Sequence, residues 1–301
     1  YRRKLVKYYE SVGIDVTADD LMITVGGSEA IFMAMTICLN PGDEVLVPEP
    51  FYANYNGFAM EAGVNIKPIS STIANDFALP PMEDFERLIT PRTKAILICN
   101  PNNPTGRLIA DDLLEEILRI CREKNIALFV DECFLSLSDG GVDLTPSLSD
   151  FPQLFILKAF TKSFGMAGLR LGYGLSADEA LLRKMSAAVP PWNVSTLAQA
   201  AGVAALGDAE LLERNRAIIR AERPWLEEKL RKFGFWVCPS QVNYILFRGD
   251  VGLTEQLRAR GVAIRDCANF EGLTSGWYRV AVRQYEENEQ LIAAIRSVGK
   301  E

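Results

Sequence analysis

The stretch from residue 93 to residue 132 reads TKAILICNPNNPTGRLIADDLLEEILRICREKNIALFVDE. Its apolar run at 93–100 predicts a strand that ends at the turn-forming residues NPNNPTG. Residues 111–124 place apolar side chains at helical spacing, and the apolar run at 126–132 predicts a second, buried strand. A strand, a helix and a strand in this order predict a βαβ unit, and therefore two parallel neighbouring strands.

The same alternation continues on both sides of this unit. Apolar runs at 21–25, within 41–48, at 153–160 and at 169–175 predict further strands. A long amphipathic helix is predicted at 205–234, and the strands that follow it are shorter. We therefore expect an α/β fold, with a mostly parallel sheet covered by helices on both faces in a large domain at 1–206, and a smaller C-terminal α+β domain at 207–301.

Composition excludes several classes of function. The 301 residues carry a net charge of −7 and no basic stripe, which argues against a nucleic-acid surface. No apolar run approaches the roughly 20 residues that cross a bilayer. The six cysteines are scattered without a CxxC pair, which is typical of reduced thiols in a cytoplasmic protein, and no metal site is predicted. The chain has no histidine, which excludes Ser-His-Asp hydrolysis and Cys-His proteolysis.

Polar and glycine residues gather where the predicted strands end. In an open parallel sheet, ligands bind at the carboxyl ends of the strands, so these residues predict one pocket. Gly27 and Ser28 open a helix after the first strand, and they predict either an anion site or a simple helix cap. Arg170 is either the cationic partner of that anion or a member of a surface ion pair.

Four other strand ends carry residues with a chemical reading beside a structural one. Asp131 ends a strand that is too apolar to face solvent, so it needs a cationic partner such as a protonated ring nitrogen, or it caps a helix. Asn103 either donates its amide to a phenolate oxygen or serves the loop alone. Tyr52 either stacks on a flat ring or packs in the core. Lys162 follows an apolar run, a setting that lowers a lysine pKa and makes the amine nucleophilic.

These motifs together resemble the fold-type I pyridoxal 5′-phosphate (PLP) enzymes, and within them the class I and II aminotransferases. The resemblance covers essentially the whole chain and rests on NPNNPTG at 100–106, VDE at 130–132 and TKSFGMAGLRLGY at 161–173. Residues 1 to about 107 resemble aspartate-type aminotransferases. The remainder resembles the threonine-phosphate decarboxylase and histidinol-phosphate aminotransferase subfamilies.

The resemblance implies a role for each candidate residue. Lys162 would form a Schiff base with the cofactor and act as the catalytic base, and Asp131 would pair with the pyridine nitrogen. Asn103 and Arg279 would bind the substrate, with Arg279 on its α-carboxylate. The implied cofactor-binding residues are Gly27, Ser28, Tyr52, Asn103, Asp131, Thr161, Lys162 and Arg170.

The resemblance also implies a homodimer that takes an amino acid and a 2-oxo acid as substrates. The apolar run AIFMAMTICL at 30–39 predicts exposed surface at the subunit interface. Because Tyr1 stands inside a predicted helix, we expect the family's N-terminal segment to be missing. Phe134 stands where aminotransferases carry tyrosine, and Ala159 stands where they carry Ser or Thr.

These observations favour an aminotransferase that acts on an amino acid or an amino-acid phosphate. The alternative is an O-phospho-L-threonine decarboxylase of cobalamin biosynthesis, whose relatives share the phenylalanine at the Phe134 position. A further alternative is a degenerate protein that binds the cofactor without turnover.

Overall fold

The computed structural model describes residues 1–208 and 210–298. Its α-helices are α1 (Arg2–Ser11), α2 (Gly26–Cys38), α3 (Asn54–Ala62), α4 (Met82–Leu88), α5 (Asp111–Lys124), α6 (Phe160–Ser163), α7 (Glu179–Ala188), α8 (Thr196–Ala205), α9 (Leu211–Lys232), α10 (Leu253–Arg258) and α11 (Tyr285–Val298). Its strands are β1 (Leu21–Thr24), β2 (Glu44–Pro48), β3 (Asn65–Ile69), β4 (Thr93–Cys99), β5 (Ala127–Asp131), β6 (Leu154–Ala159), β7 (Gly172–Leu175), β8 (Trp236–Val237), β9 (Tyr244–Arg248), β10 (Arg265–Asp266) and β11 (Trp277–Ala281). Short 3₁₀ turns are η1 (Ile73–Asn75), η2 (Leu135–Leu137) and η3 (Thr145–Ser147).

Seven strands form the large sheet, in the order β1-β7-β6-β5-β4-β2-β3. The neighbouring pairs from β6 across to β3 are all parallel, whereas β7 runs antiparallel to both β6 and β1. Between β6 and β7 the chain forms only the short helix α6 and a loop, so it turns back beside β6 instead of crossing over a face. The predicted mostly parallel sheet is confirmed, with β7 as its antiparallel member.

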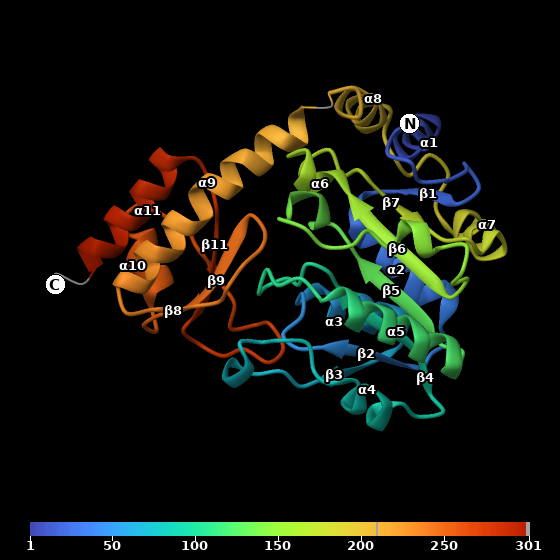
Figure 1. Cartoon of the computed structure of the whole chain (residues 1–301), viewed down its shortest axis with the longest axis horizontal. Coiled ribbons are helices and arrows are strands. Elements are labelled where there is room, and N and C mark those ends of the chain that lie inside the picture. Colours follow the sequence, from blue (N-terminus) through green and yellow to red (C-terminus); the bar gives the residue numbers. More distant parts are fainter. Residues whose placement is uncertain (209, 299–301) are drawn as a thin grey trace.

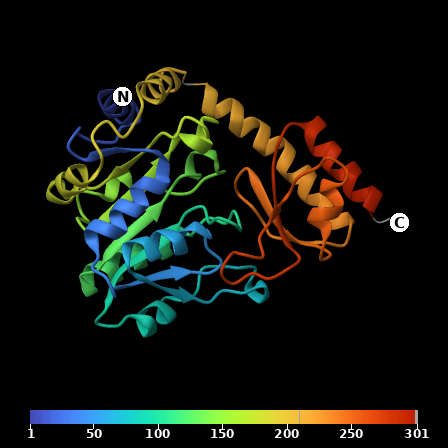
Figure 2. The same ribbon diagram turned by 180° about the vertical axis from the view of Figure 1, so that it is seen from behind.

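Helices cover both faces of this sheet (Figures 1 and 2). Along β5, Leu128 and Val130 pack with α1, α4, α5 and α8, whereas Phe129 packs on the other face with α2, α3 and α7. Because side chains alternate along a strand, Asp131 continues on the α2 and α3 face, and Glu132 points to the opposite one. The two carboxylates at the end of β5 therefore serve different faces of the sheet.

Two sequence predictions were wrong in detail. The run AIFMAMTICL does not form an exposed interface, since its residues Ala30, Ile31 and Met33–Met35 are buried between the sheet and helices α3 and α7. The single helix predicted at 205–234 is divided into α8, which ends at Ala205, and α9, which begins at Leu211. A turn at Gly207 separates them, because glycine stabilises a helix interior poorly.

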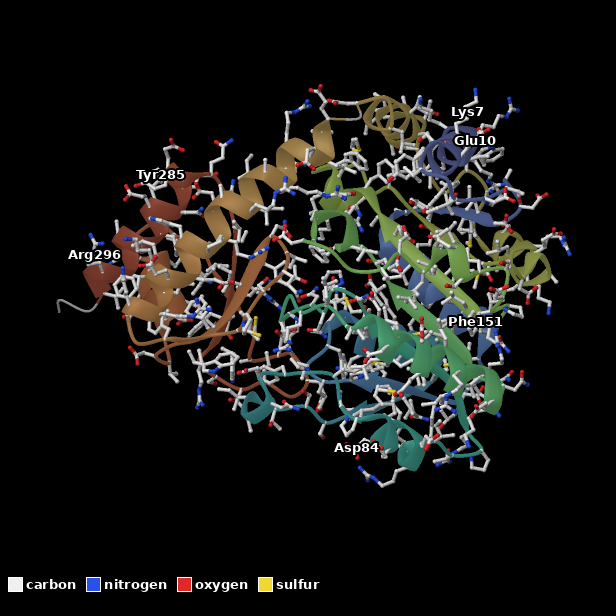
Figure 3. The ribbon with its side chains drawn as sticks, viewed as in Figure 1. Lys7, Glu10, Asp84, Phe151, Tyr285 and Arg296 are labelled. Atoms are coloured by element: carbon white, nitrogen blue, oxygen red, sulfur yellow. The ribbon has the colours of Figure 1, made fainter. Side chains whose placement is uncertain are left out.

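A second, antiparallel sheet has the order β10-β11-β9-β8 and packs against α9, α10 and α11. Helix α9 runs from the large sheet to this smaller one (Figure 1). Helix α9 also contacts η2, which belongs to the predicted large domain, so α9 does not pack against the small sheet alone. The domain boundary between residues 206 and 207 stays a prediction. Charged side chains of the outer helices, such as Lys7, Glu10 and Arg296, project away from the ribbon (Figure 3). None of the described helices combines the length and apolarity that a bilayer span requires.

Candidate active site

A cavity of about 370 Å³ opens where β4, β5 and β6 end. All nine residues predicted for the site line it: Gly27, Ser28, Tyr52, Asn103, Asp131, Thr161, Lys162, Arg170 and Arg279. They come from seven separate parts of the chain, which the parallel strands bring to one edge of the sheet. The structure thus brings the whole predicted set together, while the role of each residue stays a prediction.

Asp131 lies at the floor of the cavity and is 8% exposed. Its Oδ2 accepts a hydrogen bond of 2.7 Å from the Tyr55 hydroxyl, and its Oδ1 accepts one of 3.0 Å from the Cys133 backbone N–H. One donor on each oxygen fixes the orientation of the carboxylate. Each oxygen has a further lone pair, so the group can still accept a proton-bearing nitrogen from the cavity.

Lys162 lies on α6, about one helical turn beyond the end of β6. Burial lowers the pKa of its ammonium group, and the positive charges of Arg279 and Arg170 lower it further. The phenyl ring of Phe134 lies 5.6 Å from Nζ. A lysine with a lowered pKa carries more of the free amine, which is the nucleophilic form that attacks an aldehyde.

The first turn of α2 and the Arg170 side chain form an anion cradle. A Cβ added at Gly26 would lie 2.9 Å from Arg170 Nη2, and one added at Gly27 would lie 2.7 Å from the Cys133 sulfur. Gly26 also has a φ of +76°, a conformation that favours glycine, so the helix can begin close to the cavity wall. The unpaired N–H groups of a helix N-terminus together with a guanidinium suit a phosphate.

The opposite wall consists of Tyr52, Asn103 and Arg279. Nη1 of Arg279 donates a hydrogen bond to Oδ1 of Asn103, which leaves the amide nitrogen of Asn103 as the group that can donate to a ligand. The Tyr52 hydroxyl accepts a hydrogen bond of 2.8 Å from Asn54 Nδ2, which holds the ring at the cavity wall. This wall and the cradle line the same cavity.

Sequence reasoning missed the part that Tyr55 and Arg265 play in the site. Tyr55 follows the same predicted strand as Tyr52, and the sequence leaves it open as a ring-stacking or a core aromatic; it is buried, and its hydroxyl donates a hydrogen bond to Asp131. Arg265 lines the cavity and pairs directly with Arg279 across β10 and β11. Its guanidinium donates a hydrogen bond of 2.9 Å to Asn269 Oδ1. Only the register of the small sheet could have identified Arg265, because its local sequence carries no signal.

The donor set fits PLP in each of its parts. The cradle suits the phosphate, Asp131 suits a protonated ring nitrogen, the Asn103 amide suits the ring oxygen, and Lys162 suits the aldehyde. Ala159 lines the same cavity and offers no hydroxyl to the phosphate.

Comparison with known proteins agrees with this geometry. The model of the family "Aminotransferase class I and II" matches residues 1–295. Threonine-phosphate decarboxylase from Salmonella typhimurium is 33% identical over 94% of this chain and 78% of its own length. Histidinol-phosphate aminotransferase from Methanococcus maripaludis is 33% identical over 91% of this chain and 74% of its own length.

Solved structures show the same likeness. Histidinol-phosphate aminotransferase from Clostridium acetobutylicum superposes with a TM-score of 0.87 at 27% identity, covering 98% of this chain and 87% of that one. Aspartate aminotransferase from Thermus thermophilus with maleate superposes with a TM-score of 0.87 at 28% identity, covering 99% and 81%. The fold is therefore that of the fold-type I PLP enzymes, and the chain belongs to the class I and II aminotransferases, a family of PLP-dependent enzymes.

Proposed function

We propose that this enzyme transfers the amino group of an amino acid or amino-acid phosphate, with Lys162 as the residue that holds the cofactor. The observation that carries the proposal is the meeting of Lys162 and Asp131 in one cavity, from the ends of the neighbouring strands β6 and β5. When bound, PLP supplies an aldehyde for a Schiff base and an electron-withdrawing ring.

The residues of the chain would then divide the work. Lys162 Nζ would take the α-proton and later return a proton, because its lowered pKa lets the amine act as a base. Asp131 keeps the ring nitrogen protonated, and its two hydrogen bonds hold it in place for that task. The cofactor contacts are assigned to Gly27, Ser28, Tyr52, Asn103, Thr161 and Arg170.

Two arginines support a substrate with two anionic groups. Arg279 would bind the α-carboxylate, since a guanidinium forms paired hydrogen bonds with a carboxylate. Arg265 is its direct cross-strand partner and lines the same cavity, so it is available for a phosphate or carboxylate on the substrate side chain. The amino-group acceptor would be a 2-oxo acid, which presents a carboxylate to the same Arg279.

The decarboxylase alternative is supported by one residue of the site and by one relative. Phe134 replaces the hydroxyl that aminotransferases of the family place near the ring oxygen, and it packs edge-on against Tyr244 with 4.9 Å between the ring centres. A relative that is 33% identical is named threonine-phosphate decarboxylase. Decarboxylation would need the substrate carboxylate, rather than the α-hydrogen, perpendicular to the ring.

Product analysis separates the two reactions. The PLP-loaded enzyme is incubated with a panel of amino acids, histidinol phosphate and O-phospho-L-threonine, each with and without 2-oxoglutarate. Glutamate formed only with 2-oxoglutarate supports transamination. Carbon dioxide released from O-phospho-L-threonine without 2-oxoglutarate supports the alternative, and the absence of both products, with the cofactor bound, contradicts the proposed activity.

We also propose that the chain works as a cytoplasmic homodimer. Trp192, in the segment before α8, is 94% exposed, and Leu197, in the first turn of α8, is 76% exposed. Large apolar side chains exposed together are typical of an interface. The six cysteines are all free, as expected of a reducing compartment. Light scattering should give the mass of two chains, and replacing both residues with lysine should shift the protein toward monomer; a monomeric native protein would contradict the proposal.

A further inference from the structure

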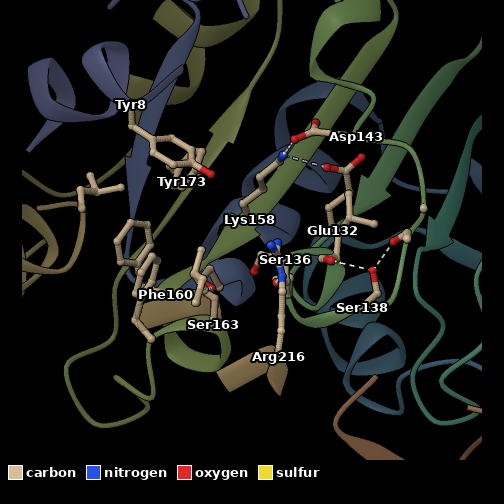
Figure 4. Close-up of a pocket in the computed structure, with 18 of the residues that line it drawn as sticks. Tyr8, Glu132, Ser136, Ser138, Asp143, Lys158, Phe160, Ser163, Tyr173 and Arg216 are labelled. Carbon is tan, nitrogen blue, oxygen red and sulfur yellow. Dashed lines mark hydrogen bonds and ion pairs between the residues drawn. The ribbon is translucent and has the colours of Figure 1, made fainter. Parts of the chain in front are cut away.

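A second cavity, of about 590 Å³, includes Glu132 and Lys158, whose side chains point to the face of the sheet opposite Asp131, and it shares Cys133 and Ala159 with the active-site lining (Figure 4). We call it the reverse-face cavity; its lining includes Tyr9, Glu132, Asp143, Lys158, Tyr173 and Arg216. The roles proposed for the active site use none of these residues.

Lys158 occupies the centre of this cavity between two carboxylates. Its Nζ lies 3.0 Å from Glu132 Oε2 and forms an ion pair with it, although Oε2 accepts no hydrogen bond. Nζ also donates a hydrogen bond of 2.5 Å to Asp143 Oδ2. The Lys158 and Glu132 side chains are 15% and 0% exposed. Burial opposes the charge on Lys158, yet Glu132, Tyr9 and Asp143 together raise its pKa well above the usual value. Lys158 therefore stays protonated and cannot replace Lys162 as the nucleophile.

The position of this ion pair in the sheet gives it a connection to the active site. The ladder between β5 and β6 ends with Asp131 opposite Leu157, so Glu132 and Lys158 are the next pair of positions. Glu132 directly follows Asp131, and Lys158 precedes Lys162 by four residues. Beyond this point the two segments diverge, since one enters η2 and the other enters α6.

The same cluster also ties down the neighbouring segments. Glu132 Oε1 accepts a hydrogen bond of 3.1 Å from the Leu144 N–H, and Asp143 Oδ1 accepts one of 2.9 Å from the Thr145 N–H. On its other side, Lys158 lies opposite Tyr173 of β7 in the sheet register. The cluster thus links the ends of β5 and β6 to the loop before η3 behind the active site.

We propose that Lys158 and Glu132 are positioning residues: their ion pair on the reverse face fixes the spacing between the segments that carry Asp131 and Lys162 on the active face. The last backbone hydrogen bond between the two segments runs from the Glu132 N–H to the Leu157 carbonyl, at 2.9 Å, and the ion pair is the next link beyond it. Neither side chain touches the cofactor pocket. The proposal rests on the roles proposed above for Asp131 and Lys162.

The test uses the PLP-loaded enzyme and a double variant, Lys158→Met with Glu132→Gln, which removes both charges of the ion pair, and the same double variant is also made with Asp143→Asn, because Asp143 otherwise loses its cation. Lys158→Arg is the conservative variant, because it keeps the positive charge. Tyr9→Phe is the control, because it removes the 3.0 Å hydrogen bond to Tyr173 in the same cavity but leaves the ion pair intact. For each protein we would measure the thermal midpoint, the bound PLP, its visible spectrum against pH, kcat and KM.

We expect the double variant to bind PLP and fold, but to lose about 10- to 100-fold in kcat, since small displacements of reacting groups are costly, with a smaller change in KM. The pH midpoint of its visible spectrum should shift, because that midpoint reports the surroundings of Lys162. Lys158→Arg should recover most of kcat, and Tyr9→Phe should match the native enzyme in both kcat and spectrum.

A folded double variant with native kcat and a native spectral midpoint would overturn the inference, whatever its thermal midpoint, since the ion pair would then serve stability alone. An arginine variant as impaired as the double variant would overturn it too. Native protein that forms no visible band with PLP would instead contradict the proposed role of Lys162, so the two failures are distinguishable.

Discussion

Replacing Tyr55 with phenylalanine removes a single hydroxyl from the wall that holds Asp131. The lost contact is the 2.7 Å hydrogen bond to Asp131 Oδ2, made by a tyrosine that is 1% exposed. A hydrogen bond to a charged group contributes about 1.5–3 kcal/mol. If that contribution acts fully on the transition state, turnover falls by about 10- to 150-fold. The Cys133 N–H remains on Oδ1, so some orientation of the carboxylate survives.

The experiment compares this variant with a matched substitution elsewhere. Tyr278→Phe also removes a buried tyrosine hydroxyl, on β11 of the small sheet, which donates a hydrogen bond of 2.9 Å to the Asp250 carbonyl and accepts one of 3.3 Å from the Leu253 N–H. We would measure kcat and KM of both variants under saturating PLP, with the thermal midpoint of each. Both should lose some stability, but only Tyr55→Phe should lose about tenfold or more in kcat. A folded Tyr55→Phe variant with native kcat would refute the assignment of Tyr55 as the residue that positions Asp131.

Three other substitutions test the remaining parts of the site. Asp131→Asn should lower turnover far more than PLP affinity. The activation free energy should rise by about 3–4 kcal/mol if the carboxylate is a preorganised electrostatic group, and unchanged kinetics would reduce Asp131 to a structural role. Phe134→Tyr should move the pH titration of the visible spectrum toward acid by adding a donor to the ring oxygen, and an unmoved titration would place the side chain away from the ring. Arg279→Leu should raise the pKa of Lys162 by removing a nearby positive charge, so chemical labelling of Lys162 in the cofactor-free protein, mapped by mass spectrometry, should require higher pH; an unchanged or lower pH dependence would contradict that cause.

The parts of the site that the sequence predicts are those with a local signal. The strand that ends at Asp131 and the turn around Asn103 are visible in short windows of residue type, and the helix predicted at 111–124 has those bounds as α5. The lysine after β6 is also marked by its neighbours. Such signals need only a few consecutive residues, so they survive without any knowledge of packing.

The parts of the site that the sequence does not predict depend on contacts between segments that are distant along the chain. Tyr55 and Asp131 are 76 positions apart, and nothing near Tyr55 distinguishes it from a core tyrosine. The approach of Arg265 to Arg279 follows from the register of β10 on β11. The run at 30–39 was misplaced for a similar reason: an apolar helix can face a partner or a sheet, and only the packing of α2 beneath α3 and α7 decides between them.

Reduction of the PLP-loaded protein with borohydride tests the central claim most directly. The reagent converts a Schiff base into a stable secondary amine, and peptide mass spectrometry then locates the modified lysine. We predict stoichiometric modification at Lys162, with its lowered pKa, and none at Lys158, which is held protonated by Glu132 and Asp143. Modification at Lys158 or at another lysine, or loss of the visible band without any modified lysine, would contradict the account.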